Sequence, residues 1–181
     1  MTIKRGLALV LGLLVLVQIG GGLQPAEAEE VPVVYETVAR QDGNVAELAG
    51  TEVQRTMTMR AADGSETTAV EMVDGSVVTV CREKDRTRLA VSLSQAASEA
   101  AGTAAFALPL ESLTLGETEE MSLTLELPQA GEALLALPLE NAASVCAQAV
   151  GGATAPVAAT VTEDGLVLPL SASDTVVLTR A

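Results

Sequence analysis

The sequence contains no histidine and no tryptophan, and its aromatic residues are a single tyrosine, Tyr35, and a single phenylalanine, Phe106. Without an imidazole group, Ser-His-Asp and Cys-His catalysis and histidine-ligated metals are excluded. Two aromatic side chains are also too few for the stacking platforms that bind single-stranded nucleic acid or sugar rings. The sequence therefore singles out no catalytic, cofactor-binding or metal-ligating residue, and we expect no cofactor.

Basic residues are scarce. Lys and Arg number 10 against 24 Asp and Glu, which gives a net charge of −14 over 181 residues. Because the chain is so acidic, it repels nucleic acid and anionic membrane surfaces. Neither is therefore an expected partner. The length allows one ordinary domain or two small ones.

The N-terminal residues carry the three-part pattern of a secretory signal peptide. Lys4 and Arg5 precede an apolar run over 6–19, and the small residues Ala26 and Ala28 flank Glu27 in a cleavage site. An uncleaved anchor is the alternative, but the run is shorter than the roughly 20 residues that a spanning helix needs. We expect cleavage after Ala28, secretion of the mature chain, and no membrane attachment afterwards.

Two cysteines, Cys81 and Cys146, remain in the mature chain. In an exported protein an even pair favours a disulfide, and closing so long a loop would stabilise the fold by roughly 4 kcal/mol in the loop-entropy model. The alternative is two thiols that pack as small hydrophobic groups. We predict a Cys81–Cys146 disulfide that joins the two halves described next.

Turn dipeptides and alternating aliphatic residues organise the mature chain. After a lead-in segment over 29–50, Asp63-Gly64 and Asp74-Gly75 predict type I′ hairpin turns in an antiparallel meander over 51–93. Residues 94–181 begin with a two-turn helix, capped by Ser94 and ended by an αL glycine at Gly102, and continue as a β-rich module. The predicted fold class is all-β: an antiparallel meander, one short helix, then a β-sandwich-like module.

A short internal repeat marks this second half. The pentapeptide Ala-Leu-Pro-Leu-Glu occurs at 107–111 and again at 136–140, and Leu168-Pro169-Leu170 repeats its centre. The match indicates a duplicated two-strand unit, with compositional coincidence as the alternative. Proline has no N–H to donate to the hydrogen bonds between strands. Each copy therefore predicts that its proline lies on an edge strand or at a β-bulge.

The order of these elements resembles the β-rich module that accompanies S-layer homology repeats in surface proteins of Gram-positive gut bacteria; the repeats themselves are absent from the 181 residues. The resemblance rests on the segments 63–64, 74–75, 107–111, 137–141, 163–167 and 174–178. It implies a secreted protein associated with the cell surface, whose partner is an envelope protein or a cell-wall polymer.

The expected function is therefore that of a non-catalytic envelope module that works through surface contacts, with self-association through edge strands as a further contact. The alternatives are an exported hydrolase that uses a carboxylate pair and an extracellular ligand-binding domain with an apolar pocket.

The one basic cluster of the mature chain, at Arg82, Lys84, Arg86 and Arg88, alternates with acidic residues. It predicts a salt-bridged solvent face rather than an anion site.

Overall fold

The structure, a computed structural model, describes residues 31–39, 45–150 and 155–181. The chain divides into two units, Met1–Glu30 and Val31–Ala181, and only the second is described. The expected signal peptide and its cleavage site lie outside the described residues.

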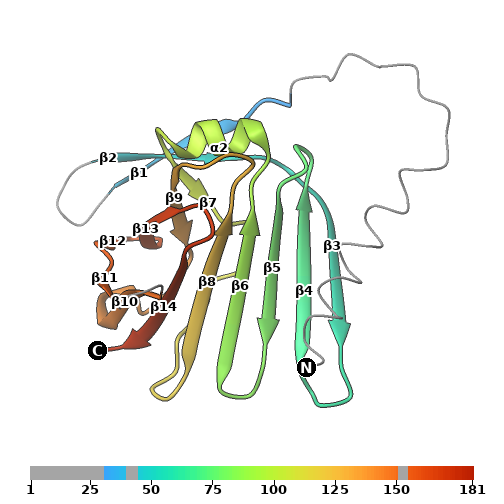
Figure 1. Ribbon diagram of the computed structural model, residues 1–181, viewed down its shortest axis with the longest axis vertical. Helices are drawn as coiled ribbons and strands as arrows, with labels where there is room; N and C mark the ends of the chain where they lie inside the picture. The colour runs from blue at the N-terminus through green and yellow to red at the C-terminus, as the bar shows by residue number, and fades with distance from the viewer. Residues whose placement is uncertain (1–30, 40–44, 151–154) are drawn as a thin grey trace, which may run out of the picture. The chain divides into compact units, whose positions relative to one another are not determined.

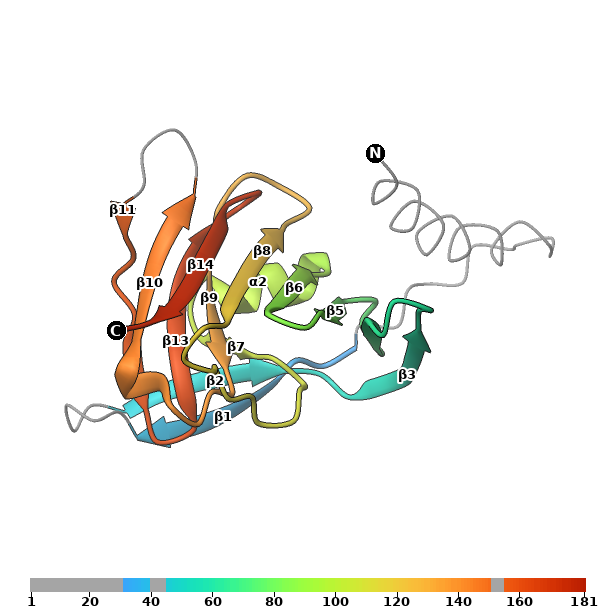
Figure 2. The ribbon, with the colours of Figure 1, turned by 90° about the horizontal axis from the view of Figure 1, so that it is seen from below.

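Two sheets form the described unit (Figures 1 and 2). Sheet A has the strand order β1-β2-β7-β9-β13-β12, and sheet B has the order β11-β10-β14-β8-β6-β5-β4-β3. The predicted all-β, sandwich-like fold is confirmed. The strands are β1 (Val34–Ala39), β2 (Val45–Gly50), β3 (Val53–Arg60), β4 (Glu66–Met72), β5 (Val77–Arg82), β6 (Arg86–Ser92), β7 (Ala105–Ala107), β8 (Glu120–Glu126), β9 (Glu132–Leu137), β10 (Val145–Val150), β11 (Ala155–Pro156), β12 (Thr160–Thr162), β13 (Gly165–Ser171) and β14 (Thr175–Arg180).

The core is aliphatic. Alternate residues of each strand point to the same face, and those that point inward are mostly Leu, Val and Ala. Phe106 is its largest side chain and is wholly buried. Each fully buried Leu or Val stabilises the fold by roughly 1.5–3 kcal/mol, so many such side chains replace the missing aromatics. Wholly buried residues lie in register across each sheet: Val78, Val91 and Leu125 in sheet B, and Phe106, Leu135 and Leu168 in sheet A.

The meander strands appear where the sequence predicts them, but they are not a separate layer. β6 pairs in parallel with β8, so β3–β6 and the strands of the second half share sheet B. The segment expected as a lead-in supplies β1 and β2, and β2 pairs in parallel with β7 of sheet A. Parallel pairs need a crossover connection, and between β6 and β8 this connection contains the helix.

The two Asp-Gly turns do not have the predicted type I′ geometry. Gly64 and Gly75 have φ of +85° and +86°, but among the described residues the only non-glycine with positive φ is Ser173. In the first hairpin Gly64 N–H donates to Ala61 O at 3.0 Å, and Ala61 N–H to Ser65 O at 2.9 Å. This is a type I turn followed by an αL glycine, the usual three-residue hairpin loop.

The predicted helix is confirmed as α2 (Gln95–Ala101), and the Ser94 hydroxyl accepts from Ala97 N–H at its start. Its buried alanines, Ala97, Ala100 and Ala101, join the core between the sheets. The predicted αL stop is wrong, since Gly102 has φ −75° and ψ −19°. The N–H groups of residues 103 and 104 both bond to Ala100 O, so the chain leaves the helix through a continued turn.

The first two copies of the pentapeptide lie side by side. β7 and β9 are parallel neighbours with Ala107 opposite Ala136, and Leu108 N–H donates to Ala136 O at 3.0 Å. The third copy differs because β13 runs antiparallel to β9, and Pro169 lies within the strand. The pairing of β13 with β12 ends at Val167, so Pro169 falls beyond it. A residue without an N–H fits such an edge position.

Candidate functional site

The predicted Cys81–Cys146 disulfide is not formed, and both residues are free thiols. Cys81 lies on β5 and Cys146 on β10, four strand positions apart in the same sheet. At about 4.8 Å per strand the backbones are roughly 19 Å apart, far beyond the 7 Å that a disulfide can span. The prediction assumed two separate halves that a bridge would clamp together, whereas hydrogen bonding across sheet B already joins them.

We therefore expect two reactive thiols in the folded protein. Alkylation without reductant should add two equivalents, with exposed Cys146 reacting faster than half-buried Cys81. Mass spectrometry of a non-reduced digest should return two separately alkylated peptides. A single cross-linked peptide would contradict the strand order of sheet B.

The outer face of sheet B, which points away from the core, carries mostly short polar side chains. Thr124 and Thr175 lie opposite each other on β8 and β14, with their hydroxyl oxygens 2.9 Å apart. Antiparallel sheets commonly have one face on the core and one in solvent, and here the solvent face extends over the whole sheet because the second-half strands continue it. The side chains of this face at the centre of the sheet are Thr79, Arg88, Ala90, Ser122, Thr124, Thr175 and Val177.

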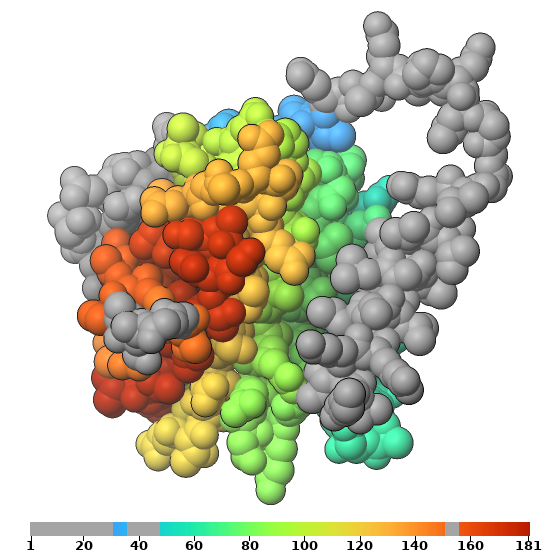
Figure 3. Space-filling view, in the orientation of Figure 1, coloured from blue at the N-terminus to red at the C-terminus, as the bar shows by residue number. Residues whose placement is uncertain are grey.

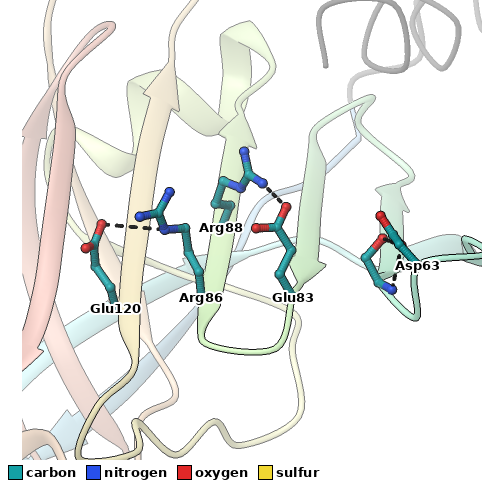
Figure 4. Close-up of polar contacts among 6 residues, drawn as sticks. Asp63, Glu83, Arg86, Arg88 and Glu120 are labelled. Atoms are coloured by element: carbon teal, nitrogen blue, oxygen red, sulfur yellow. Dashed lines mark hydrogen bonds and ion pairs between the residues drawn. The ribbon is translucent and has the colours of Figure 1, made fainter. Parts of the chain in front are cut away.

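The basic cluster lies on the hairpin of β5 and β6, where Arg86 and Arg88 belong to this face and Arg82 belongs to the opposite one. The β5–β6 turn projects at the lower end of the molecule in Figure 3. Figure 4 shows Arg88 paired with Glu83, and Arg86 Nε 3.8 Å from Glu120 Oε1 on β8. These pairs match the expected salt-bridged face, and partly exposed pairs of this kind contribute about 0–1 kcal/mol each. The Arg88 Nε atom is buried and finds no hydrogen-bond partner among the residues that the structure describes.

Two more cation–anion pairs lie across the neighbouring strands β3 and β4. Arg55 is 2.6 Å from a Glu71 oxygen, and Arg60 is 2.7 Å from a Glu66 oxygen. Each pair joins residues directly opposite in the antiparallel register. Opposite charges at such positions stabilise the pairing of the two strands by up to about 1 kcal/mol.

Charge is therefore unevenly distributed over the described chain. Residues 51–93 contain six basic and seven acidic side chains, a net charge of −1. Residues 94–181 contain one basic and eleven acidic side chains, a net charge of −10. The β3–β6 part of sheet B is nearly neutral, while the rest of the described surface is strongly acidic.

Acidic residues that are neighbours in the sequence, such as Glu119 and Glu120, contact different partners. The Glu119 carboxylate accepts Gly116 N–H at 2.8 Å, and neighbouring Glu120 faces Arg86. Over residues 31–39, 45–150 and 155–181, no three Asp, Glu or Cys side chains gather as a metal site would require.

The carboxyl group of Asp63 has an altered pKa. Hydrogen bonds from Ser65 lower the pKa below the ordinary value of 3.8. Its contribution to stability is present above pH 3.8 and is lost as the pH falls below that value.

A small apolar hollow lies at the β7, β9 and β13 strands of sheet A. Its walls include Leu48, Ala107, Ala136 and Val167, and its volume is about 80 Å³. Ligand pockets commonly enclose 300–1,000 Å³ or more, so this hollow does not supply the pocket that a ligand-binding domain would need. It is too small for a drug-sized molecule.

The fold thus defines a class, a β-sandwich of two mixed sheets with one short helix in the crossover. Comparison with protein-family models, with curated proteins and with solved structures finds no match to this chain. Within the described residues, no helix is long and apolar enough to cross a membrane.

Proposed function

We propose that the protein is an exported, non-catalytic module of the bacterial envelope, and that it contacts a cell-wall polymer or an envelope protein through the outer face of sheet B. One observation carries the proposal: six of the seven basic side chains in the described residues gather on β3–β6, beside a wide face of short hydroxyl side chains. Short polar side chains that are held rigidly in a sheet suit contact with an extended surface. The signal-peptide pattern and the resemblance to modules beside S-layer homology repeats support the location.

The β5–β6 turn projects beyond the end of this face (Figure 3) and carries Lys84, which is exposed. Arg82, the last residue of β5, is also exposed, although it lies in line with Val78 and Val80 on the opposite side of the strand. Many cell-wall polymers are anionic, and the acidic residues 94–181 repel them. The β3–β6 part is nearly neutral, so its exposed cations can attract such polymers locally, in a manner that salt screens. We expect these two side chains to strengthen the contact. Arg86 and Arg88 already have carboxylate partners and contribute less.

Fractionation of cells that produce the full chain tests the proposal. The protein should appear in the wall fraction with a new N-terminus at Glu29, and it should sediment with purified sacculi. Replacing Arg82→Gln and Lys84→Gln together should weaken sedimentation about tenfold at low salt, whereas Arg180→Gln, at the end of β14, should leave it unchanged. Protein found only in the cytoplasm, or bound neither to sacculi nor to any envelope protein in pull-downs, would refute the proposal.

A further inference from the structure

Within the part of the chain that the structure describes, strand β3 forms one edge of sheet B, and all eight of its side chains are exposed. Met59 and Met57 on its outer face are 51% and 37% exposed, which is unusual for methionine. Side chains that point to the other face, such as Thr58, are exposed as well, so sheet A does not cover this strand. An uncovered edge of this kind is a template for a further strand.

The backbone of this edge is regular. After an irregularity between Val53 and Arg55, the strand pairs with β4 without interruption up to Arg60. The Ala61 N–H donates to Ser65 O across the hairpin. The backbone N–H and C=O groups of the odd-numbered residues of β3 therefore point toward β4. Because antiparallel strands alternate in this respect, the N–H and C=O groups of Thr56, Thr58 and Arg60 point to the free side.

The other sheet edges are less suited to accept a strand. β11 has two residues, one of which is Pro156, and β12 has three. β1 has six residues, but it includes the acidic residue Glu36 in an already acidic chain. β3 contains no proline and no lysine, the residues with which proteins commonly block an edge.

Charge indicates that the occupant is a second copy of this chain. Two copies repel through residues 94–181, which carry a net charge of −10 each. The only charged residues of β3 are Arg55 and Arg60, and each is held by a glutamate of β4, so the edge itself is locally neutral. This edge therefore allows two copies to approach with little repulsion.

The sequence of β3 is also compatible with pairing to itself. An antiparallel pair with Thr58 opposite Thr58 sets Met57 opposite Met59 of the other copy on the outer face. On the opposite face Thr56 then lies across from Arg60, so no two like charges stand opposite each other. The pair brings four exposed methionines together and satisfies the free N–H and C=O groups.

We propose that β3 is a homodimerisation strand: two copies pair it antiparallel about a two-fold axis at Thr58 and join their B sheets into one continuous sheet. This inference concerns self-association and does not depend on the proposed envelope function. One strand from each copy buries less than the roughly 1,600 Å² of a standard interface. We therefore expect a weak dimer, with a Kd between about 1 µM and about 1 mM.

Sedimentation equilibrium of the full chain from about 10 µM to about 1 mM tests the dimer. Thr58→Pro removes an N–H that points to the free edge, a position where β-sheets tolerate proline, and should weaken the dimer at least tenfold. Met57→Lys combined with Met59→Lys should have the same effect by placing four ammonium groups at the contact. Val150→Lys, at an exposed apolar residue of β10, is the matched control and should leave the dimer unchanged.

A wild-type chain that remains monomeric over this range would overturn the proposal. So would a dimer that survives both β3 changes, since its contact would then lie elsewhere. Mass that continues to grow beyond the dimer would show open-ended pairing rather than a two-fold contact, and would also overturn it. Unfolding curves of each variant show whether the monomer stays folded. Because one variant changes the backbone of β3 and the other changes only its side chains, the second still tests the dimer if the first unfolds.

Discussion

A Gly165→Ala substitution is expected to lower the free energy of unfolding by about 3–4 kcal/mol. Gly165 begins β13 with φ +140°, and a Cβ atom there would lie 2.6 Å from Leu139 N and closer still to Leu137 O. Both obstacles are backbone atoms of the second Leu-Pro-Leu segment, so no side chain can rotate to make room. Relief requires β13 to move away from β9, its partner in sheet A. Urea denaturation measures the loss.

Gly64→Ala provides the control for this substitution. Gly64 also has a positive φ, +85°, but nothing lies within 4 Å of a Cβ atom built there. The conformational cost of placing alanine at this φ is about 1–2 kcal/mol. If Gly165→Ala costs no more than Gly64→Ala, the close approach of β13 to the Leu137–Leu139 backbone does not occur.

An Asp74→Ala substitution is expected to cost about 2–3 kcal/mol, the second-largest effect. The Asp74 carboxylate accepts hydrogen bonds from Ser76 N–H at 2.9 Å, the Ser76 hydroxyl at 3.0 Å and the Ser94 hydroxyl at 2.8 Å. Ser76 is wholly buried, and its hydroxyl oxygen accepts Ser94 N–H at 2.9 Å. This network ties the β4–β5 turn to the N-cap of α2. Its loss leaves the buried Ser76 hydroxyl and the half-buried Ser94 hydroxyl without this acceptor.

The other Asp-Gly-Ser turn is a matched control. Asp63 accepts from Ser65 N–H at 2.9 Å and from the Ser65 hydroxyl at 2.7 Å, the same local pattern, but the turn is exposed and contacts no helix. Asp63→Ala should therefore lower the free energy of unfolding clearly less than Asp74→Ala does. Equal unfolding midpoints for the two alanine variants would show that the link to Ser94 contributes nothing to stability.

Local patterns predicted most of the secondary structure. Turn dipeptides and aliphatic alternation located the meander over 51–93, where β3–β6 lie, and Ser94 marked the start of the helix. These features depend on neighbours in the chain, which is the information that periodicity and capping contain. The type of each turn was harder to predict from the sequence. A glycine with positive φ occurs both in type I′ turns and in type I turns followed by an αL residue.

The candidate surface was predicted only in part. The basic cluster is evident from its spacing, but its partner Glu120 is not, because Arg86 and Glu120 meet through the parallel pairing of β6 with β8. The buried network of Asp74 joins a turn to a helix cap 20 residues away, which no local pattern reveals. The β3 edge was likewise invisible, because which strand ends a sheet depends on all the others.

The sequence by itself determined an all-β chain with aliphatic alternation, tight Asp-Gly turns and one short capped helix, because each of these follows from contacts within a few residues. The tertiary structure alone decided which strands share a sheet. Backbone hydrogen bonds are the same for every residue type, so the parallel pairs β2–β7, β7–β9 and β6–β8 leave no signature in composition. That choice placed Cys81 and Cys146 four strands apart, required a glycine at position 165, and left β3 exposed at the edge of sheet B.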